Sequence, residues 1–153
     1  MKNINPKTIE NLDLKRYMGK WYEIARFDHR FEKGLQAVTA EYSFRRDGKI
    51  RVKNCGRKKD PSGPLNCIIG KARPARNGQA GKLRVSFFLF FYSDYNILEL
   101  DSDYEWALIG SYSPKYLWIL SRTPELRPET LNVILKKAEF RGYDVSKLIF
   151  IQH

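Results

Sequence analysis

Gly19-Lys20-Trp21-Tyr22-Glu23-Ile24-Ala25-Arg26 is the stretch that decides the fold, together with Tyr116-Leu117-Trp118-Ile119-Leu120-Ser121-Arg122 far downstream. Both stretches are rich in aromatic and β-branched residues, which favour extended strands. The first carries a tryptophan near its start, and the second ends on an arginine. A guanidinium over an indole ring gains roughly 0.5–2 kcal/mol. We therefore predict an early strand that begins near Trp21 and a late strand that ends near Arg122.

The composition indicates one globular domain over residues 1–153. The chain has 153 residues, and 42% of them are hydrophobic, which is enough to build a sizeable core. No apolar run is long enough to cross a bilayer. No positively charged segment followed by an apolar segment opens the sequence, so nothing in it resembles a secretion signal.

The net charge of +11 favours anionic partners, such as nucleic acid, an anionic membrane surface or fatty acids. Solubility alone is an equally good explanation of this charge. The densest basic cluster, Arg57-Lys58-Lys59, falls in a predicted hairpin loop. We interpret it as a solvated turn rather than a binding patch.

Eight short strands are expected after an N-terminal arm over residues 1–16. The turn sequence Asp47-Gly48 is a strong hairpin signal, and a second turn falls around Pro61. Several short strands at this spacing indicate an antiparallel sandwich or barrel, and closure into a barrel removes exposed edges. The expected strands are Trp21–Phe27, Ala37–Phe44, Ile50–Gly56, Asn66–Arg73, Lys82–Phe88, Tyr95–Asp101, Trp106–Tyr112 and Tyr116–Ser121.

One helix is predicted over residues 128–141. Pro128 stands at a tolerated first-turn position, and Gly142 is typical of the residue that follows a helix. An apolar stripe at helical spacing runs from Leu131 to Ala138. A last extended segment, Leu148–Gln152, follows.

Four ordered blocks of the sequence resemble the bacterial lipocalins related to apolipoprotein D. This resemblance implies an all-β fold, an eight-stranded antiparallel up-and-down β-barrel with a C-terminal α-helix and a short extra strand. It also implies that Gly19, Trp21 and Arg122 form the closed floor of the barrel. Asp103-Tyr104 matches the family's second motif. The four blocks are Trp21–Glu32, Val85–Phe88, Tyr116–Pro124 and Gly142–Lys147.

Membership of that family implies binding and transport, storage or scavenging of a small hydrophobic ligand, a fatty acid or a lysophospholipid, without a cofactor. Many bacterial members are tethered to the outer membrane through a lipidated N-terminal cysteine. This sequence has no cysteine near its start. The resemblance therefore favours the cell envelope, in the periplasm or at the outer membrane, over the cytoplasm, and leaves monomer or homodimer open.

Side chains alternate between the two faces of a strand, so charged residues identify the outward face and their neighbours the inward one. Each inward residue can contact a ligand or simply fill a core. The small residue Ala40 argues for space, and the buried amide of Asn54 needs a partner. The predicted ligand-contacting residues are Ala40, Tyr42, Val52, Asn54, Ile68, Leu83, Val85, Phe87, Tyr116 and Trp118.

A head group would remain at the open end of such a cup. Arg26, His29 and Arg30 lie at or after the end of the first strand, in the loop expected beside the mouth. They are candidates to pair with a carboxylate or phosphate. A solvated basic loop is the equal alternative.

Cys55 and Cys67 lie symmetrically about Pro61 in one predicted hairpin. Directly opposed residues are within disulfide range, so we predict a disulfide, and a slip of one residue in the register would instead leave two free thiols. No metal site is predicted, because the chain has only two histidines and neither is at ligand spacing.

No enzymatic activity is predicted. The sequence lacks a nucleophile elbow and a phosphate-binding glycine-rich loop. Two other classes remain as alternatives: a protein-interaction module, and a basic nucleic-acid-binding barrel with a filled core. The second is disfavoured because alternation places the aromatic residues inward, where bases cannot stack on them.

Overall fold

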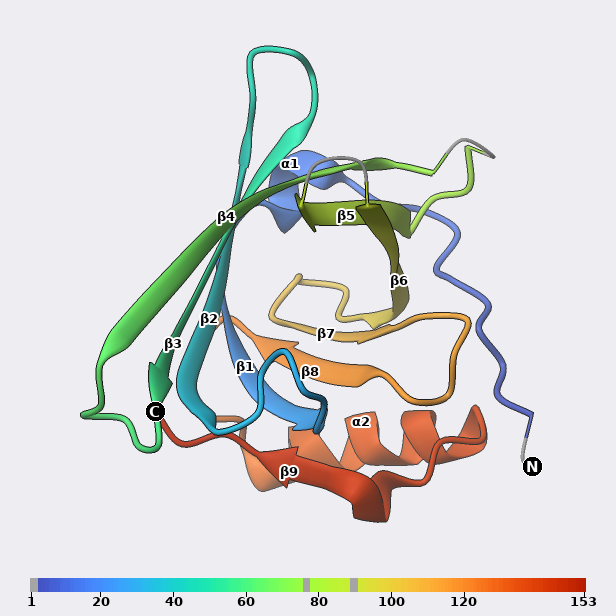
Figure 1. The fold of residues 1–153 in the computed structure, drawn as a ribbon. Helices are drawn as coiled ribbons and strands as arrows, with labels where there is room; N and C mark the ends of the chain where they lie inside the picture. Colours follow the sequence, from blue (N-terminus) through green and yellow to red (C-terminus); the bar gives the residue numbers. More distant parts are fainter. Residues whose placement is uncertain (1–2, 76–77, 89–90) are drawn as a thin grey trace.

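The computed structural model describes residues 3–75, 78–88 and 91–153 (Figure 1). Strands dominate in these residues, and the longer of the two α-helices described comes near the C-terminal end of the chain. In order, the elements are α1 (Leu14–Tyr17), β1 (Gly19–Phe27), β2 (Leu35–Phe44), β3 (Ile50–Lys58), β4 (Leu65–Pro74), β5 (Lys82–Phe88), β6 (Phe91–Leu100), β7 (Trp106–Gly110), β8 (Leu117–Ser121), α2 (Pro128–Phe140), the 3₁₀ helix η1 (Val145–Lys147) and β9 (Leu148–Phe150).

The sheet is a closed antiparallel barrel, as the sequence predicts. Strands β2 to β8 pair in chain order, and β1 pairs with both β8 and β2 to close the ring. A bulge between Glu23 and Ala25 marks the point beyond which β1 pairs with β9 instead of β2. The last strand therefore lies outside the ring and extends its edge beside the mouth (Figure 1).

The barrel wall separates two hydrophobic cores. One lies inside the barrel and includes Trp21, Ile50 and Ile97. The other lies between the outer surface of the wall and α2, and it includes Ile134 of the helix. Helix α2 ends as predicted, because Gly142 follows it with a φ of +99°, a conformation that glycine adopts without strain.

The closed end is built around Arg122. Its guanidinium carbon lies 3.7 Å from the centroid of the Trp21 ring. Gly19 has a φ of +101°, and a Cβ there would approach the Arg122 guanidinium to 3.3 Å, so glycine suits both the conformation and the space. The guanidinium also donates to the backbone carbonyls of Arg16, Tyr17, Met18, Lys20 and Tyr104.

The arm over residues 1–16 leads into a short helix that the sequence did not reveal. Asp13 caps α1 by accepting from the backbone of Lys15 and Arg16. The helix carries Tyr17 into the barrel, where its hydroxyl lies 2.7 Å from that of Tyr95. The Tyr42 hydroxyl also lies 2.9 Å from the Tyr95 hydroxyl. Burial raises the pKa of all three tyrosines, so their hydroxyl groups stay neutral at the closed end of the barrel.

Several predicted strand boundaries are wrong by a few residues. Strand β7 ends at Gly110 rather than Tyr112, because the Ser111 hydroxyl bonds the backbone of Ser113 and turns the chain. Strand β6 begins at Phe91 rather than Tyr95. Strand β2 begins at Leu35 and passes through a bulge in which Ala37 has a φ of +50°.

Cys55 and Cys67 face each other in the β3–β4 ladder and are joined by a disulfide. The two cysteines are 12 residues apart in sequence. A crosslink of this length restricts the unfolded chain and ties the start of β4 to β3.

Replacing Arg122 with Lys should lower the free energy of unfolding by about 2–4 kcal/mol, because an ammonium cannot reach all these carbonyls and leaves some of them unpaired. Chemical denaturation measures the change. The exposed Arg127 is the matched control, and Arg127→Lys should change stability by less than about 0.5 kcal/mol. Equal effects of the two variants would contradict this account of the floor.

The double variant Cys55→Ser, Cys67→Ser should lose about 3 kcal/mol of stability. Denaturation of the wild type in a strong reductant should give the same loss. An unchanged denaturation midpoint in both experiments would show that the crosslink does not stabilise the fold.

Candidate functional site

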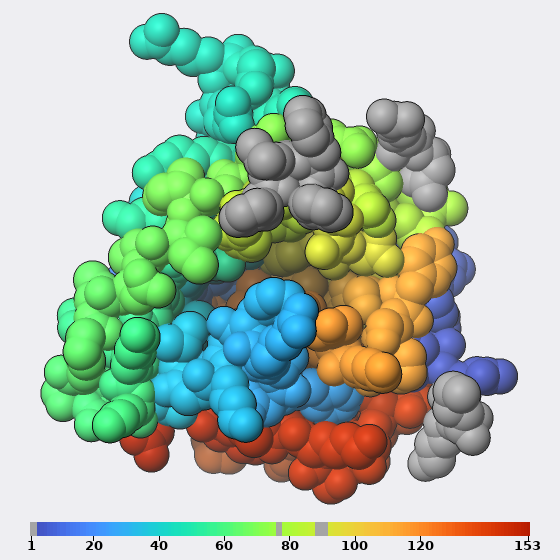
Figure 2. Space-filling view, viewed as in Figure 1, coloured from blue at the N-terminus to red at the C-terminus, as the bar shows by residue number. Residues whose placement is uncertain are grey.

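The mouth of the barrel contains a cavity of about 390 Å³. Figure 2 shows the molecule hollowed at this end, behind the light-blue β1–β2 loop (residues 28–34). This loop and the β3–β4 hairpin are held together, since the Lys59 amide donates to the Gly34 carbonyl at 2.9 Å. The cavity is lined by Phe31, Glu32, Lys33, Gly34, Leu35, Val38, Asn54, Cys55, Gly56, Lys58, Lys59, Asn66 and Ile68.

Apolar side chains from two strands and the loop line the cavity. Leu35 and Val38 come from β2, and Ile68 comes from β4. A Cβ on Gly56 would lie 3.2 Å from Leu35 and 3.4 Å from Val38, so the glycine makes room for both. Between them lies Asn54, whose Oδ1 is buried without a hydrogen-bond partner. The wall therefore suits an aliphatic chain and offers it one polar contact.

Three lysines, Lys33, Lys58 and Lys59, also line this cavity. All three are exposed, and in the described part of the chain no carboxylate forms an ion pair with any of them. Our interpretation of Arg57-Lys58-Lys59 as a solvated turn is therefore incomplete, because two of its members line the mouth.

Arg26 is not a head-group residue, and that prediction is wrong. Its side chain is fully buried, with Nη1 2.9 Å from Glu23 Oε2. Nη2 donates to the Glu32 carbonyl at 2.7 Å and lies 3.4 Å from Asp28. The bulge in β1 turns the Arg26 side chain under the loop, where its charge is neutralised and holds the loop in place.

The interior carboxylate of Glu32 fastens the loop from the other side. Its Oε1 accepts from Trp118 Nε1 at 2.8 Å and lies 2.8 Å from His29 Nε2. Burial alone would raise the pKa of Glu32, but hydrogen bonds from His29, Glu23 and Trp118 outweigh it and lower the pKa. Glu32 is therefore a stable anion inside the barrel.

The pKa of Glu23 shifts in the opposite direction. Burial, followed by the negative charge of Glu32, raises its pKa well above the ordinary value. The negative charge of Glu32 thus opposes the ionisation of Glu23, whose Oε2 lies 2.9 Å from the Arg26 guanidinium.

The other two residues predicted at the mouth, His29 and Arg30, lie in the β1–β2 loop and differ in exposure. His29 is largely buried and its ring lies 5.6 Å from both Tyr116 and Trp118. Arg30 is exposed, with its guanidinium 4.9 Å from the Phe31 ring. Of the two, only Arg30 presents a free cation on the rim.

The structure divides the predicted ligand-contacting residues into three groups. Asn54 and Ile68 line the mouth cavity. The side chains of Tyr42, Val52 and Leu83 are only 7%, 1% and 5% exposed. They belong to the packed interior, toward the closed end of the barrel. The others lie at the margins of the inner core. Ala40, Val85 and Trp118 are partly buried against it. Phe87 lies over Gly70, and the Tyr116 ring stacks on that of Trp118.

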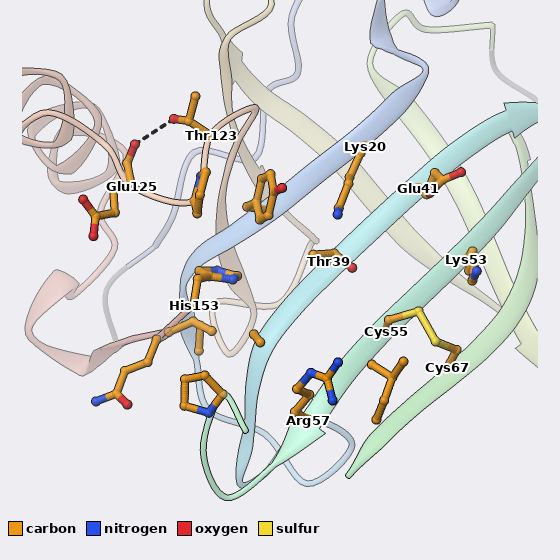
Figure 3. A pocket seen from close by; sticks show the side chains of 17 residues that line it. Lys20, Thr39, Glu41, Lys53, Cys55, Arg57, Cys67, Thr123, Glu125 and His153 are labelled. Atoms are coloured by element: carbon orange, nitrogen blue, oxygen red, sulfur yellow. Dashed lines mark hydrogen bonds between the residues drawn. A yellow bond between two sulfur atoms is a disulfide. The ribbon is translucent and has the colours of Figure 1, made fainter. Parts of the chain in front are cut away.

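A larger groove of about 1220 Å³ lies on the outside of the wall (Figure 3). Its lining residues follow every second position, such as Lys20 and Tyr22 on β1 and Thr39 and Glu41 on β2. The intervening Trp21 faces the barrel interior, so these residues share the outward face. The groove is polar and open, with charges of both signs, and we do not take it as the ligand site.

Two further residues of the site, Val38 and Glu23, follow from the alternation along the strands. Val38 stands two positions before Ala40, and Glu23 stands two positions after Trp21, so both belong to the inward rows. Nothing in the sequence signals the fold-back of Glu32 into the barrel, because that depends on tertiary contacts with Trp118 and Arg26.

A closed eight-stranded cup with a stacked Trp–Arg floor and a cavity at its mouth defines a small-ligand-binding barrel. The family model described as "Lipocalin-like domain" matches residues 12–153. The chain therefore belongs to the lipocalin family, whose members bind small hydrophobic ligands.

Similar proteins occur in bacteria, plants and animals. The chain is 48% identical over 144 residues to the outer membrane lipoprotein Blc of Escherichia coli, covering 94% of this chain and 81% of that protein. It is 35% identical over 153 residues to mouse apolipoprotein D, covering 94% and 78%. Insecticyanin from the tobacco hornworm shares the fold, with a TM-score of 0.77 at 24% identity over 96% of this chain and 84% of the other.

Glu32→Gln should lower stability at neutral pH by about 1–3 kcal/mol, because the buried donors lose a charged acceptor. Because the pKa of Glu32 is lower in the folded protein than in the unfolded chain, its ionised form stabilises the fold. This stabilisation is fully present above the ordinary glutamate pKa of about 4.3. It is lost as the pH falls through the pKa of Glu32 in the folded protein. The difference between wild type and variant should therefore shrink in acid.

Denaturation curves across this pH range test the prediction, with the exposed Glu125→Gln as control. A stability difference that stays constant from neutral pH into acid would contradict an ionised, hydrogen-bonded Glu32.

Proposed function

We propose that this lipocalin binds a single-chain anionic lipid, a fatty acid or a lysophospholipid, for transport, storage or scavenging. The observation that supports the proposal is the mouth cavity, in which an apolar wall ends at three unpaired lysines. The chain of the lipid would lie against Leu35, Val38 and Ile68. Its carboxylate or phosphate would meet the lysines at the rim.

Transfer from water supplies the affinity. Each buried methylene contributes about 0.8 kcal/mol, so the part of the chain that enters the cavity sets the strength of binding. The packed floor limits its depth, because Tyr17, Tyr42 and Tyr95 already occupy the closed end. A single flexible chain therefore suits the cup better than a bulky multi-ring ligand.

We propose a binding role without catalysis, in the cell envelope. Both cysteines are used in the disulfide, and disulfides persist in oxidising compartments such as the periplasm. The bacterial relatives named above as outer membrane lipoproteins support the same compartment. Among the described residues, no helix is long and apolar enough to span a membrane.

Native mass spectrometry of the purified protein, followed by solvent extraction, tests the proposal. We expect a stoichiometric fatty acid or lysolipid, either co-purified or bound after addition of oleate. A clean apo mass that oleate does not change would contradict the proposal and favour an interaction module with a filled barrel.

Val38→Trp should fill the cavity and weaken binding of a fluorescent fatty acid by roughly tenfold or more, equivalent to about 1.4 kcal/mol. The exposed Val133→Trp on α2 is the matched control and should bind normally. Fluorescence titration gives both dissociation constants. Equal affinities of the two variants would place the fatty acid elsewhere.

Lys58→Glu with Lys59→Glu should weaken binding of the fatty acid, again by roughly tenfold, because an attraction becomes a repulsion. Binding of a fatty alcohol of the same length should change little. Lys115→Glu with Lys136→Glu supplies a control of equal charge change. An equal loss of affinity for the alcohol would show that the lysines do not bind the charged head group.

A further inference from the structure

We infer that the lipid in the mouth cavity carries a hydroxyl group on its alkyl chain, and that Asn54 recognises this group by accepting a hydrogen bond from it. This inference rests on the proposed function, because it names the chemistry of the ligand at the same site. It is carried by one polar atom of the cavity lining. Asn54 Oδ1 is buried and has no hydrogen-bond partner.

Strand pairing fixes the face of the wall on which Asn54 lies. In the ladder it is directly opposite Ala40 of β2 and Ile68 of β4. Ala40 is in turn directly opposite Trp21 of β1. Residues opposite each other share a face of the sheet, and Trp21 belongs to the core inside the barrel. The amide group of Asn54 is therefore on the inner face of the wall.

Asn54 also lies at the inner end of the cavity. On β3 the inward residues from Asn54 to Lys58 line the cavity. Val52, the next inward residue toward the closed end, is 1% exposed and packs in the inner core. Asn54 and Lys58 are four residues apart, which is about 13 Å at the rise of a strand. A chain whose anion is held by the lysines thus meets Asn54 far from its head group.

An unpaired buried acceptor favours a ligand that brings a donor, because leaving the acceptor unpaired costs free energy. A buried water needs several polar contacts, and the side chains opposite Asn54, those of Ala40 and Ile68, supply none. A cationic donor would be repelled by the three lysines of the rim. A hydroxyl is the smallest neutral donor and adds the least polar surface to be buried against the apolar wall.

Asn54 therefore acts on specificity. An unsubstituted chain covers Oδ1 with methylene groups and leaves it unpaired, whereas a hydroxylated chain donates to it. A site built to bind a hydroxyl discriminates against the analogue that lacks one. We expect the difference in affinity to depend on where the hydroxyl stands along the chain.

Competition against a fluorescent fatty acid tests the inference on the wild-type protein. The probes are stearate, 12-hydroxystearate and 2-hydroxystearate, which have the same chain length. The 12-hydroxy acid should bind roughly three- to tenfold more tightly than stearate. The 2-hydroxy acid should bind like stearate, because its hydroxyl stays near the lysines. Equal affinities for stearate and 12-hydroxystearate, or an equal gain for the 2-hydroxy acid, would overturn the inference.

The ketone 12-oxostearate tests the direction of the hydrogen bond. A ketone accepts a hydrogen bond but donates none, so it should bind no more tightly than stearate. A gain equal to that of the 12-hydroxy acid would show that Asn54 donates through its Nδ2, and would overturn the assignment of Oδ1 as the acceptor.

Asn54→Leu removes the acceptor with little change in size. The preference for 12-hydroxystearate should disappear, and the affinity for stearate should rise, because the chain no longer covers an unpaired oxygen. Asn132→Leu on the exposed side of α2 is the matched control and should keep the preference. A preference that survives in Asn54→Leu, or that both variants lose equally, would contradict the role of Asn54.

Thermal unfolding followed by circular dichroism confirms that each variant is folded. The midpoint of Asn54→Leu should not fall, because the substitution removes a buried group without a partner. The comparison of the ligands on the wild type needs no variant. Binding of stearate and 12-hydroxystearate with equal affinity refutes this inference alone, whereas failure of every fatty acid to bind refutes the proposed function.

Discussion

The guanidinium of Arg122 is the contact on which the rest of the architecture depends. It covers the Trp21 ring and gathers carbonyls from the arm, the first strand and the turn before β7. Strand pairing closes the ring, and Arg122 links these segments at the end where the chain enters the barrel. With that end closed and packed with tyrosines, a ligand has access only from the opposite end.

The open end is organised by a second arginine, Arg26, which is fully buried. Arg26 and the carboxyl groups of Glu23 and Glu32 anchor the β1–β2 loop over the mouth. Buried charge is costly unless it is paired, and here each charged group has a partner within the cluster. The free cations of the mouth come instead from Lys33, Lys58 and Lys59, at the surface where the β1–β2 loop meets the β3–β4 hairpin. Interior charges thus shape the mouth, and exterior charges remain available to a head group.

The strands could be predicted because they are short and end in strong turn signals, but this pattern left a sandwich and a barrel open. The resemblance to the lipocalins decided for the barrel. Alternation also placed Val52 and Tyr42 on the inward face, but it could not tell a packed floor from an open cavity. That distinction depends on Tyr17, which enters the barrel from a helix of one turn in the arm. The assignment of Arg26 to the mouth failed for a related reason. The bulge after Glu23 changes the direction of β1, and a bulge leaves little trace in a single sequence. The position of Lys58 and Lys59 beside the cavity follows from how two loops pack together, which local patterns do not encode.

Crystallography with a brominated fatty acid tests most directly the central claim that the mouth cavity holds the lipid chain. The anomalous signal of bromine locates the chain without reference to any assumed pose. Our account predicts a bromine peak inside the barrel, near Val38, Asn54 and Ile68, with the carboxylate near the three lysines. A peak in the outer groove beside Lys20 and Thr39, or no peak at saturating ligand, would contradict it.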